Sequence, residues 1–315
     1  MADTQTSTPA VHTTSEGLFS PQQIGEIFNR VAGHSTIAAL SAQKPIPFAG
    51  VESYVFTMDG EAAIVGEGQP KPAGKADFAK VLVKPLKVVY QHRLTDEFKY
   101  MADEAALPYL EAFMDGFAKK IARALDIMAF HGLNPADKTA SELIGSNCFD
   151  KKITETVEFD AANADDNIQA AVTTVQGKDR YTNGFAMTPA FATAMGNIKE
   201  KTGSKVPMYP EFRFGGHPQS FGGMKADVNN TLAFGASTKA GDKNDEAIVG
   251  DFQNALKWGY TNSMKTELIE YGDPDGQGDL KHTNQVVLRA EAYIGWGILD
   301  TDSFVRIVKT VPAAS

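Results

Sequence analysis

The chain has 315 residues, of which 43% are hydrophobic and 22% are charged, close to the averages for soluble globular proteins. Its formal net charge of −9 argues against tight, sequence-independent nucleic-acid binding, because that affinity comes from neutralising phosphates with Lys and Arg. A single cysteine, Cys148, excludes an internal disulfide and a cysteine-based zinc site, and no window reaches the roughly 18 apolar residues of a membrane span.

The N-terminal segment divides into an arm and a short helix. Residues 1 to about 20 are rich in Thr and Ser and have no periodicity, so we expect a mobile arm. Ser20 followed by Pro21 is a helix-start signal, and the apolar residues from Ile24 to Val31 then follow helical spacing. The alternating residues that come next, up to Met58, predict an extended strand.

A Gly- and Pro-rich stretch at 60–74 separates this strand from a second extended segment rich in Val and Lys. The pattern predicts a long two-stranded hairpin with a loose tip. Pro85 cannot donate to a strand ladder, so we expect its strand to be an edge. An isolated two-stranded ribbon is marginally stable in water, and we therefore expect it to pack on a neighbouring subunit.

A long amphipathic helix is predicted at 107–132, because apolar residues recur there at spacings of three and four. Pro108 suits the first helical position, and Gly132 suits the left-handed residue just past the end. Such a helix is roughly 36 Å long, which is enough to cross a whole subunit.

The rest of the chain predicts a middle unit and a set of late strands. Asn163 is a candidate cap for a helix, FAMTP at 185–189 is a candidate buried strand, and the helix after it should close at Gly203. Residues after about 247 read as antiparallel strands. We infer that the middle unit is an insertion within the part that contains the long helix.

Catalytic and ligand-binding motifs are scarce. The Gly66-Glu67-Gly68 stretch lacks the third glycine of a dinucleotide fingerprint and favours a flexible tip. The segment 273–279 imitates the start of a calcium loop, but position twelve is Asn284, where a Glu is required, so a solvated turn is favoured. We expect no catalytic site and no cofactor.

We also expect no metal site, because no two histidines have the three- or four-residue spacing that places both on one helical face. The histidines are His12, His34, His92, His131, His217 and His282. Asp115 and Lys119 are spaced for an ion pair on a solvated helical face. Arg289 and Glu291 share one strand face and could form an ion pair between subunits, or an exposed pair that contributes little.

Taken together, the order of these parts resembles the phage major capsid protein family, whose Hong Kong 97-type fold is used by tailed phages and by bacterial encapsulin shells. No single motif is diagnostic, but the order and spacing extend over about residues 20 to 310. The matching segments are IVGEGQPKP with ADFAKVLVKPLKVVYQHRLTDEF, LPYLEAFMDGFAKKIARALDIMAFHGLN, NGFAMTPAFATAMGNIKEKTG, IVGDFQNALKWGY, and VVLRAEAYIGWGILDTDSFVRI.

The resemblance implies an α+β fold with a long spine helix, an extended hairpin loop, a peripheral domain and an axial domain. The corresponding boundaries are an N-terminal arm and short helix at 1–48, the extended hairpin at 49–93, a peripheral domain with the spine helix at 94–160, an axial domain at 161–247, and peripheral-domain strands at 248–315.

The function that the resemblance implies is that of a major capsid protein without enzymatic activity. Its copies would form pentamers and hexamers of an icosahedral virion shell, assembled in the host cytoplasm around packaged dsDNA that is bound without sequence specificity. Expected partners are a portal protein and a separate scaffolding protein, and no membrane. An alternative is an encapsulin-like compartment, and a third is a soluble enzyme whose site forms only in three dimensions. Candidate assembly-interface residues are Glu67, Lys71, Lys75, Lys80, Lys84, Lys87, Arg289 and Glu291.

Overall fold

The computed structural model describes residues 34–60, 62–97, 103–201, 203–261 and 265–313. The predicted N-terminal arm and short helix lie outside these residues. The described helices and turns are α2 (Thr36–Leu40), α3 (Asp103–His131), α4 (Phe149–Lys152), α5 (Ala164–Gln176), α6 (Pro189–Asn197), and the 3₁₀ turns η2 (Pro210–Gly215), η3 (Asn230–Ala233) and η4 (Lys281–Thr283). None of the described helices is long and apolar enough to cross a membrane.

The described strands fall into three sheets. A two-stranded sheet pairs β1 (Val51–Asp59) with β2 (Lys75–Val83). A four-stranded sheet contains β3 (Leu86–Thr95), β9 (Leu256–Tyr260), β10 (Lys265–Ile269) and β11 (Gln285–Ile298). A six-stranded sheet contains β4 (Thr156–Glu158), β5 (Gly184–Met187), β6 (Ser220–Phe221), β7 (Met224–Val228), β8 (Lys243–Gly250) and β12 (Phe304–Thr310).

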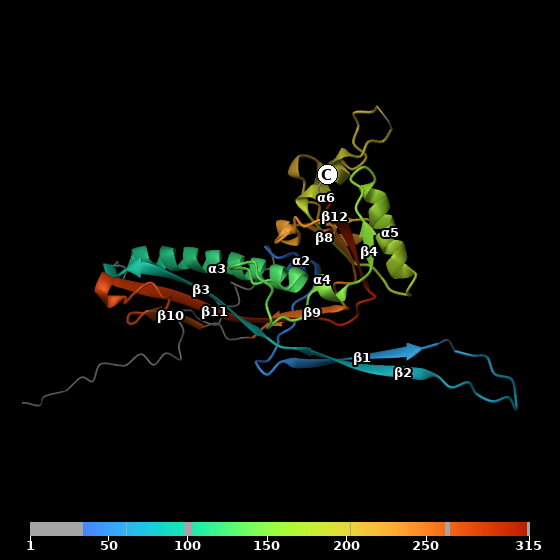
Figure 1. The fold of residues 1–315 in the computed structure, drawn as a ribbon, viewed down its shortest axis with the longest axis horizontal. Helices are drawn as coiled ribbons and strands as arrows, with labels where there is room; N and C mark the ends of the chain where they lie inside the picture. The colour runs from blue at the N-terminus through green and yellow to red at the C-terminus, as the bar shows by residue number, and fades with distance from the viewer. Residues whose placement is uncertain (1–33, 61, 98–102, 202, 262–264, 314–315) are drawn as a thin grey trace, which may run out of the picture.

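An elongated body forms where α3 lies along the four-stranded sheet (Figure 1). Strand β11 pairs with β3 along one edge and with β10 and β9 along the other. The apolar face of α3 and the inner residues of β11 share one hydrophobic core, in which Phe117, Ile121 and Trp296 are almost fully buried. The long amphipathic helix predicted from the sequence therefore supplies one wall of this core.

The six-stranded sheet forms the second unit of the molecule, with strand order β4-β12-β8-β5-β7-β6. One face packs against α5 and α6 in a second core that includes Phe185, Phe191 and Val305. The opposite face sends Ile248 and Phe304 into the core beneath α3. Strand β12 comes from the end of the chain, so the sheet takes strands from outside residues 161–247.

A buried carboxylate, Asp126 on α3, holds the short helix α2 in place. Its two oxygens accept hydrogen bonds from the Ser35 hydroxyl (2.5 Å) and from the amides of Thr36 (2.9 Å) and Ile37 (3.2 Å) at the start of α2. The Thr231 hydroxyl of η3 donates a fourth (3.0 Å). Burial raises the pKa of Asp126 to about 6, and these four donors act in the opposite direction. One side chain thus joins three elements.

Three predicted helix ends can be compared with the structure. Gly132 follows α3 with a φ of +68°, which confirms the predicted left-handed stop. The prediction of Pro108 as the first helical residue is wrong, because α3 begins at Asp103, where acidic residues and good helix formers extend it by five residues. Asn163 does precede α5, but its amide binds Asp160 and does not cap the helix.

The predicted end of the next helix at Gly203 is also wrong. Helix α6 ends at Asn197, and the chain then turns so that Lys199 forms a β-bridge with Pro207. The backbone of η2 packs closely on the last turn, because a Cβ on Gly196 would lie 2.9 Å from the Phe212 carbonyl oxygen. Packing against η2 therefore shortens a helix that the sequence pattern alone would continue.

Candidate assembly surface

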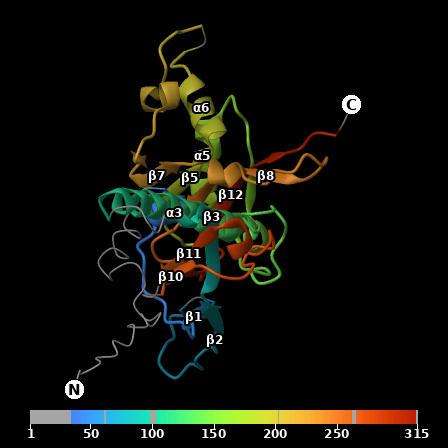
Figure 2. The same ribbon diagram turned by 90° about the vertical axis from the view of Figure 1, so that its left-hand side faces the viewer.

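The ribbon, defined as β1, β2 and the connecting residues 60–74, projects from one side of the body (Figure 1). Its strands are antiparallel, with Val51 opposite Val83 and Asp59 opposite Lys75. This register confirms the predicted long hairpin. The ribbon and the loop between α6 and η2 lie on opposite sides of the body in both views (Figures 1 and 2).

The predicted second strand of the hairpin is divided in two by Pro85. Strand β2 ends at Val83, and β3 begins at Leu86 and pairs with β11 in a different sheet. Proline lacks the amide hydrogen that a continuous ladder needs, which accounts for the change of partner at this point. Strand β3 is an edge of the four-stranded sheet, as the sequence predicts.

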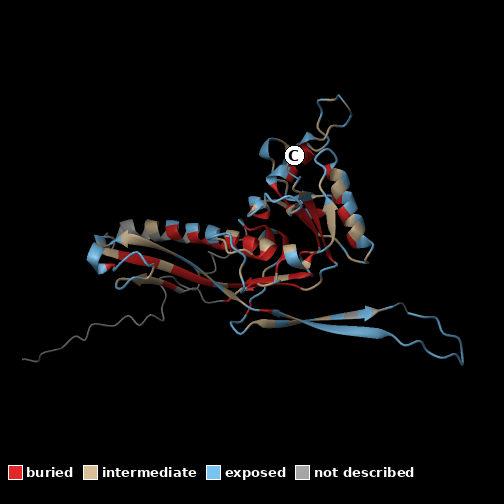
Figure 3. Ribbon diagram, in the orientation of Figure 1, coloured by how far each residue is buried: buried red, intermediate tan, exposed pale blue. Residues whose placement is uncertain are grey.

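Most of the ribbon is exposed in the isolated chain (Figure 3). One face of the ribbon carries four large apolar side chains beside the Glu52–Lys80 ion pair. Its residues alternate along β1, and the opposing side chains of β2 lie on the same face because of the register. The Tyr54 and Phe78 rings stack with centroids 5.1 Å apart. The exposed large side chains are Tyr54 (58%), Phe56 (59%), Met58 (72%) and Phe78 (62%).

The base of the ribbon is held by the body. Val83 is fully buried, and a Cβ on Gly297 of β11 would lie only 2.7 Å from Val83 Cγ2, so glycine allows this close approach. Lys257 of β9 reaches the Ser53 hydroxyl at 3.5 Å. The ribbon is thus anchored at one end and uncovered along its length.

Four of the eight charged residues predicted for the interface lie on this ribbon, and Lys84 lies just beyond its base. Glu67, Lys71, Lys75 and Lys84 are exposed. Lys80 forms an ion pair with Glu52 at 2.5 Å, and the hydrogen bond from Lys80 holds the pKa of Glu52 below its usual value. An exposed pair of this kind contributes little to stability.

Arg289 and Glu291, the candidates on β11, both have partners within the same chain. The Arg289 guanidinium donates to Gln91 at 2.7 Å and lies 3.7 Å from the Glu267 carboxylate. Glu291 accepts from Lys87, a third interface candidate, at 3.0 Å. Within the folded subunit, Arg289 and Glu291 are therefore paired with residues of neighbouring strands of the same chain.

A second exposed patch lies at the far end of the six-stranded unit. Phe214 in η2 is 98% exposed with a φ of +56°, and the Arg213 guanidinium lies 5.1 Å from its ring centroid. Val206 and Met208, in the preceding loop, are also more than half exposed. The two apolar exposed regions thus occupy opposite extremities of the subunit.

A polar cluster fills the junction between α3, α4 and the six-stranded sheet. Arg306 on β12 forms ion pairs with Asp150 (2.9 Å) and Asp245 (2.8 Å), and His131 contacts Asp150 at 2.9 Å. Burial and the Asp150 charge raise the pKa of Asp245 to about 8. Burial pulls the pKa of His131 down, but the hydrogen bond and charge of Asp150, the charge of Asp245 and the Thr231 carbonyl together leave that pKa raised.

The candidate calcium turn is held by an arginine. Arg93 on β3 donates to Asp275 through two nitrogens at 2.8 and 2.5 Å and to the Gly278 carbonyl at 2.8 Å. Arg93 also lowers the pKa of Asp275 to about 2. The guanidinium therefore compensates the charge that a cation would otherwise balance.

The hydrogen bonds of three described histidines show no activated nucleophile. His92 contacts the Tyr109 hydroxyl, His131 contacts Asp150 and the Thr231 carbonyl, and His217 contacts the Val228 carbonyl. None of these partners is a serine or a cysteine, which a histidine base would activate in nucleophilic catalysis.

Comparison with known proteins gives one consistent result. The model of the phage capsid family matches residues 17–309. The comparison with curated proteins gives no match.

Solved structures match nearly the full chain. A structure from Mycobacterium phage Ogopogo is 30% identical, with a TM-score of 0.73, and the match covers 88% of this chain and 92% of that one. A structure from Gordonia phage Cozz is 25% identical, with a TM-score of 0.67, and the match covers 90% and 87% of the two chains. The capsid of an empty GTA particle, computed with C5 symmetry, shares the fold at 15% identity and a TM-score of 0.57 over 98% and 95% of the two chains.

Proposed function

The chain belongs to the phage capsid family and is a major capsid protein, and from this premise we propose that it forms an icosahedral shell in which each ribbon covers a neighbouring subunit. The exposed apolar face of the ribbon carries this proposal. Four large side chains on one face of a two-stranded sheet have no core of their own, and burying each stabilises an assembly by about 1.5 to 3 kcal/mol. A second copy supplies the missing surface.

The parts of the subunit then take distinct roles. In this proposal α3 is the spine helix and the ribbon is the extended loop of a Hong Kong 97-type subunit. The four-stranded sheet belongs to the peripheral domain. The six-stranded unit is the axial domain, and its exposed Phe214 faces other copies around the five- and six-fold axes. Contacts of this head-to-tail kind are heterologous and close into rings.

The proposed content of the shell is double-stranded DNA. The formal net charge of −9 favours a wall that encloses DNA without adhering to it. A portal protein and a separate scaffolding protein complete the assembly, which takes place in the host cytoplasm. Electron microscopy of purified particles tests this proposal, because DNA inside supports it and enclosed protein cargo would support the encapsulin-like alternative.

Shortening the ribbon tests the role of its tip. We replace residues 60–74 by Asn-Gly, which joins the paired residues Asp59 and Lys75 through a two-residue hairpin turn. The subunit should remain folded and soluble, as judged by circular dichroism, but it should fail to form shells in electron micrographs. Normal particles from this variant would contradict the proposal.

A matched control separates the ribbon from exposed apolar residues in general. Tyr181 is 83% exposed and lies between α5 and β5, in the six-stranded unit and not on the ribbon. The Tyr181→Ser variant should assemble as the wild type does. If it loses assembly to the same degree as the shortened ribbon, the effect is not specific to the ribbon.

A further inference from the structure

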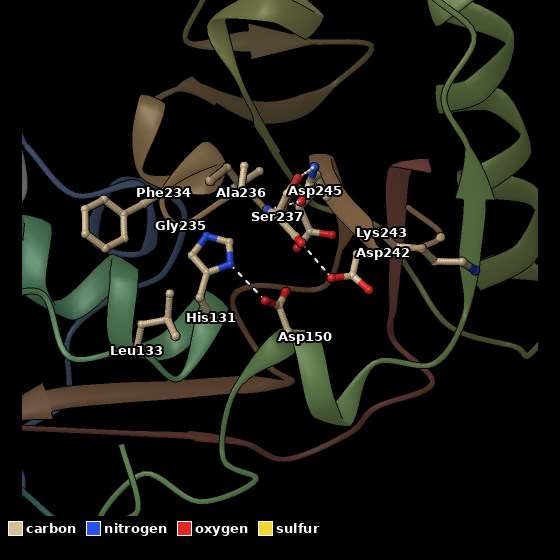
Figure 4. A pocket seen from close by; sticks show the side chains of 13 residues that line it. His131, Leu133, Asp150, Phe234, Gly235, Ala236, Ser237, Asp242, Lys243 and Asp245 are labelled. Carbon is tan, nitrogen blue, oxygen red and sulfur yellow. Dashed lines mark hydrogen bonds and ion pairs between the residues drawn. The ribbon is translucent and has the colours of Figure 1, made fainter. Parts of the chain in front are cut away.

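The polar cluster at the junction contains three groups that could share one cation. His131 lies at the end of α3, Asp150 lies on α4, and Asp245 lies on β8, and one ligand atom from each falls within 4.8 Å of the others. All three line a cavity of about 410 Å³ (Figure 4). Their positions in the chain are far apart, so only the tertiary structure brings them together.

Arg306 contacts the Oδ1 atom of both Asp150 and Asp245, and it leaves the Oδ2 atom of each carboxylate for another partner. Its Nε donates to Asp245 Oδ1 at 2.8 Å, and its Nη2 donates to Asp150 Oδ1 at 2.9 Å and lies 2.8 Å from Asp245 Oδ1 in an ion pair. Asp245 is only 4% exposed, and its Oδ2 is buried without a hydrogen-bond partner among the described residues. Buried polar atoms almost always have a partner, so we expect this oxygen to bind a proton donor or a cation.

The histidine presents a third lone pair. His131 Nε2 lies 3.0 Å from the Thr231 carbonyl, which can only accept, so Nε2 carries a hydrogen. In the neutral ring, Nδ1 then has a lone pair directed at Asp150 Oδ2, 2.9 Å away. Two facing acceptors, with a carboxylate oxygen of Asp245 within 4.8 Å of the other two residues' ligand atoms, require a proton or a metal ion between them.

A β-bulge in β8 places Asp245 on this side of the sheet. Ala247 pairs with Ile307 and Asp245 pairs with Val308, so the register passes over Glu246. The extra residue reverses the alternation of side chains, and Asp245 therefore lies on the face of Arg306. Bulges often redirect a side chain in this way next to a functional site.

We propose that His131 Nδ1, Asp150 Oδ2 and Asp245 Oδ2 bind one divalent transition-metal ion, for which Zn²⁺ is the best match. An imidazole with two carboxylates suits Zn²⁺, whereas Mg²⁺ and Ca²⁺ prefer oxygen ligands alone. Ligand atoms around one Zn²⁺ lie about 3.4 Å apart, so the cluster closes slightly on binding. The open cavity supplies the remaining position with water.

The residues around the three ligands are those that such a site requires. The Thr231 carbonyl fixes the tautomer of His131, and the Arg306 guanidinium orients both carboxylates. The ion would join the end of α3 and α4 to β8, where the two hydrophobic cores meet. The site is thus a structural link within the subunit, independent of how copies assemble.

Equilibrium dialysis of the untagged full chain against ZnCl₂, with metal quantified by mass spectrometry, tests the proposal. The wild type should bind one Zn²⁺ ion. The His131→Gln and Asp245→Asn substitutions should each lower the affinity for Zn²⁺ at least about tenfold. Asp242→Asn is the matched control, because Asp242 lines the same cavity but binds the Ser237 hydroxyl instead. Its affinity for Zn²⁺ should equal that of the wild type.

A second measurement uses the wild type alone, in case a variant fails to fold. Its thermal unfolding midpoint should rise with Zn²⁺ concentration and stay unchanged with equal concentrations of Mg²⁺. Absence of both binding and stabilisation would overturn the proposal and assign a proton to the contact between Nδ1 and Oδ2. Equal losses in Asp242→Asn and Asp245→Asn would overturn it as well.

Discussion

The ribbon and the body show opposite uses of the same kind of strand. In the body, β11 is buried on both faces for most of its length, between partner strands and α3. In the ribbon, β2 is exposed at nearly every residue, and only Val83 at its base is buried. The difference shows that the body contains its own core, whereas most of the ribbon is left uncovered by the described residues, as expected if a neighbouring copy covers it in the proposed shell.

The largest expected effect comes from breaking the body. Ile121 is fully buried in the middle of α3, so Ile121→Pro removes a helical hydrogen bond and core packing together. We expect a loss of about 3 kcal/mol or more, and no soluble folded subunit in expression trials. Lys120→Ala, at the adjacent exposed position, should leave solubility unchanged. A soluble Ile121→Pro subunit with a normal melting curve would contradict the role given to α3.

The next largest loss of stability is expected at Asp126, whose carboxylate binds the start of α2 to α3. Asp126→Asn replaces one acceptor oxygen by an NH₂ group, which then faces donors such as the Thr36 amide. We expect the free energy of unfolding to fall by about 2 to 4 kcal/mol, measured by urea denaturation of the unassembled subunit. Asp115→Asn, on the exposed face of the same helix, should change it by about 0.5 kcal/mol or less. Equal losses in the two variants would remove the special role of Asp126.

The ribbon should behave in the opposite way. Phe56 and Phe78 are directly opposed, and Phe56→Ser with Phe78→Ser removes this exposed cross-strand pair and the stacking of Phe78 on Tyr54 from the isolated subunit. The unfolding free energy should change by about 1 kcal/mol or less, while shell formation in electron micrographs is lost. A large loss of subunit stability would show that the ribbon belongs to the core.

The smallest effect concerns the turn that Arg93 holds at the edge of the body. The folded-state pKa of Asp275, about 2, lies below its ordinary value of 3.8, so its contribution is present above that value and is lost as pH falls through the folded pKa. The difference in melting temperature between wild type and Asp275→Asn should therefore be constant above about pH 5 and shrink between about pH 4 and pH 2. A constant difference over that whole range would contradict the ion pair.

The sequence predicts the local features of the fold better than their surroundings. The hairpin, the buried strand at 184–187 and the late strands are all found in the structure, because alternation and turn residues act over a few positions. The end of α6 was missed because it depends on contact with η2. The exposed apolar face of the ribbon has a visible signal, since Tyr54, Phe56 and Met58 alternate along one strand.

The candidate metal cluster shows the limit of such reasoning. Searching for histidines three or four residues apart can find ligands on one helix only, whereas His131, Asp150 and Asp245 lie on three separate elements. The β-bulge that turns Asp245 toward Arg306 depends on how β8 pairs with β12. No spacing rule within a single segment contains that information.

By itself, the sequence determined the long helix and its glycine stop, the hairpin, and the order of parts that marks a capsid subunit. The helix, its stop and the hairpin depend on short-range periodicity, backbone conformation and turn chemistry, which neighbouring residues specify, whereas the order of parts was read from its resemblance to the family. The tertiary structure alone decided that β3 leaves the hairpin for β11, that β12 completes the six-stranded sheet, and that three distant side chains meet beside Arg306. Each of these depends on packing between segments that are far apart in the chain, and local sequence preferences carry no information about such contacts.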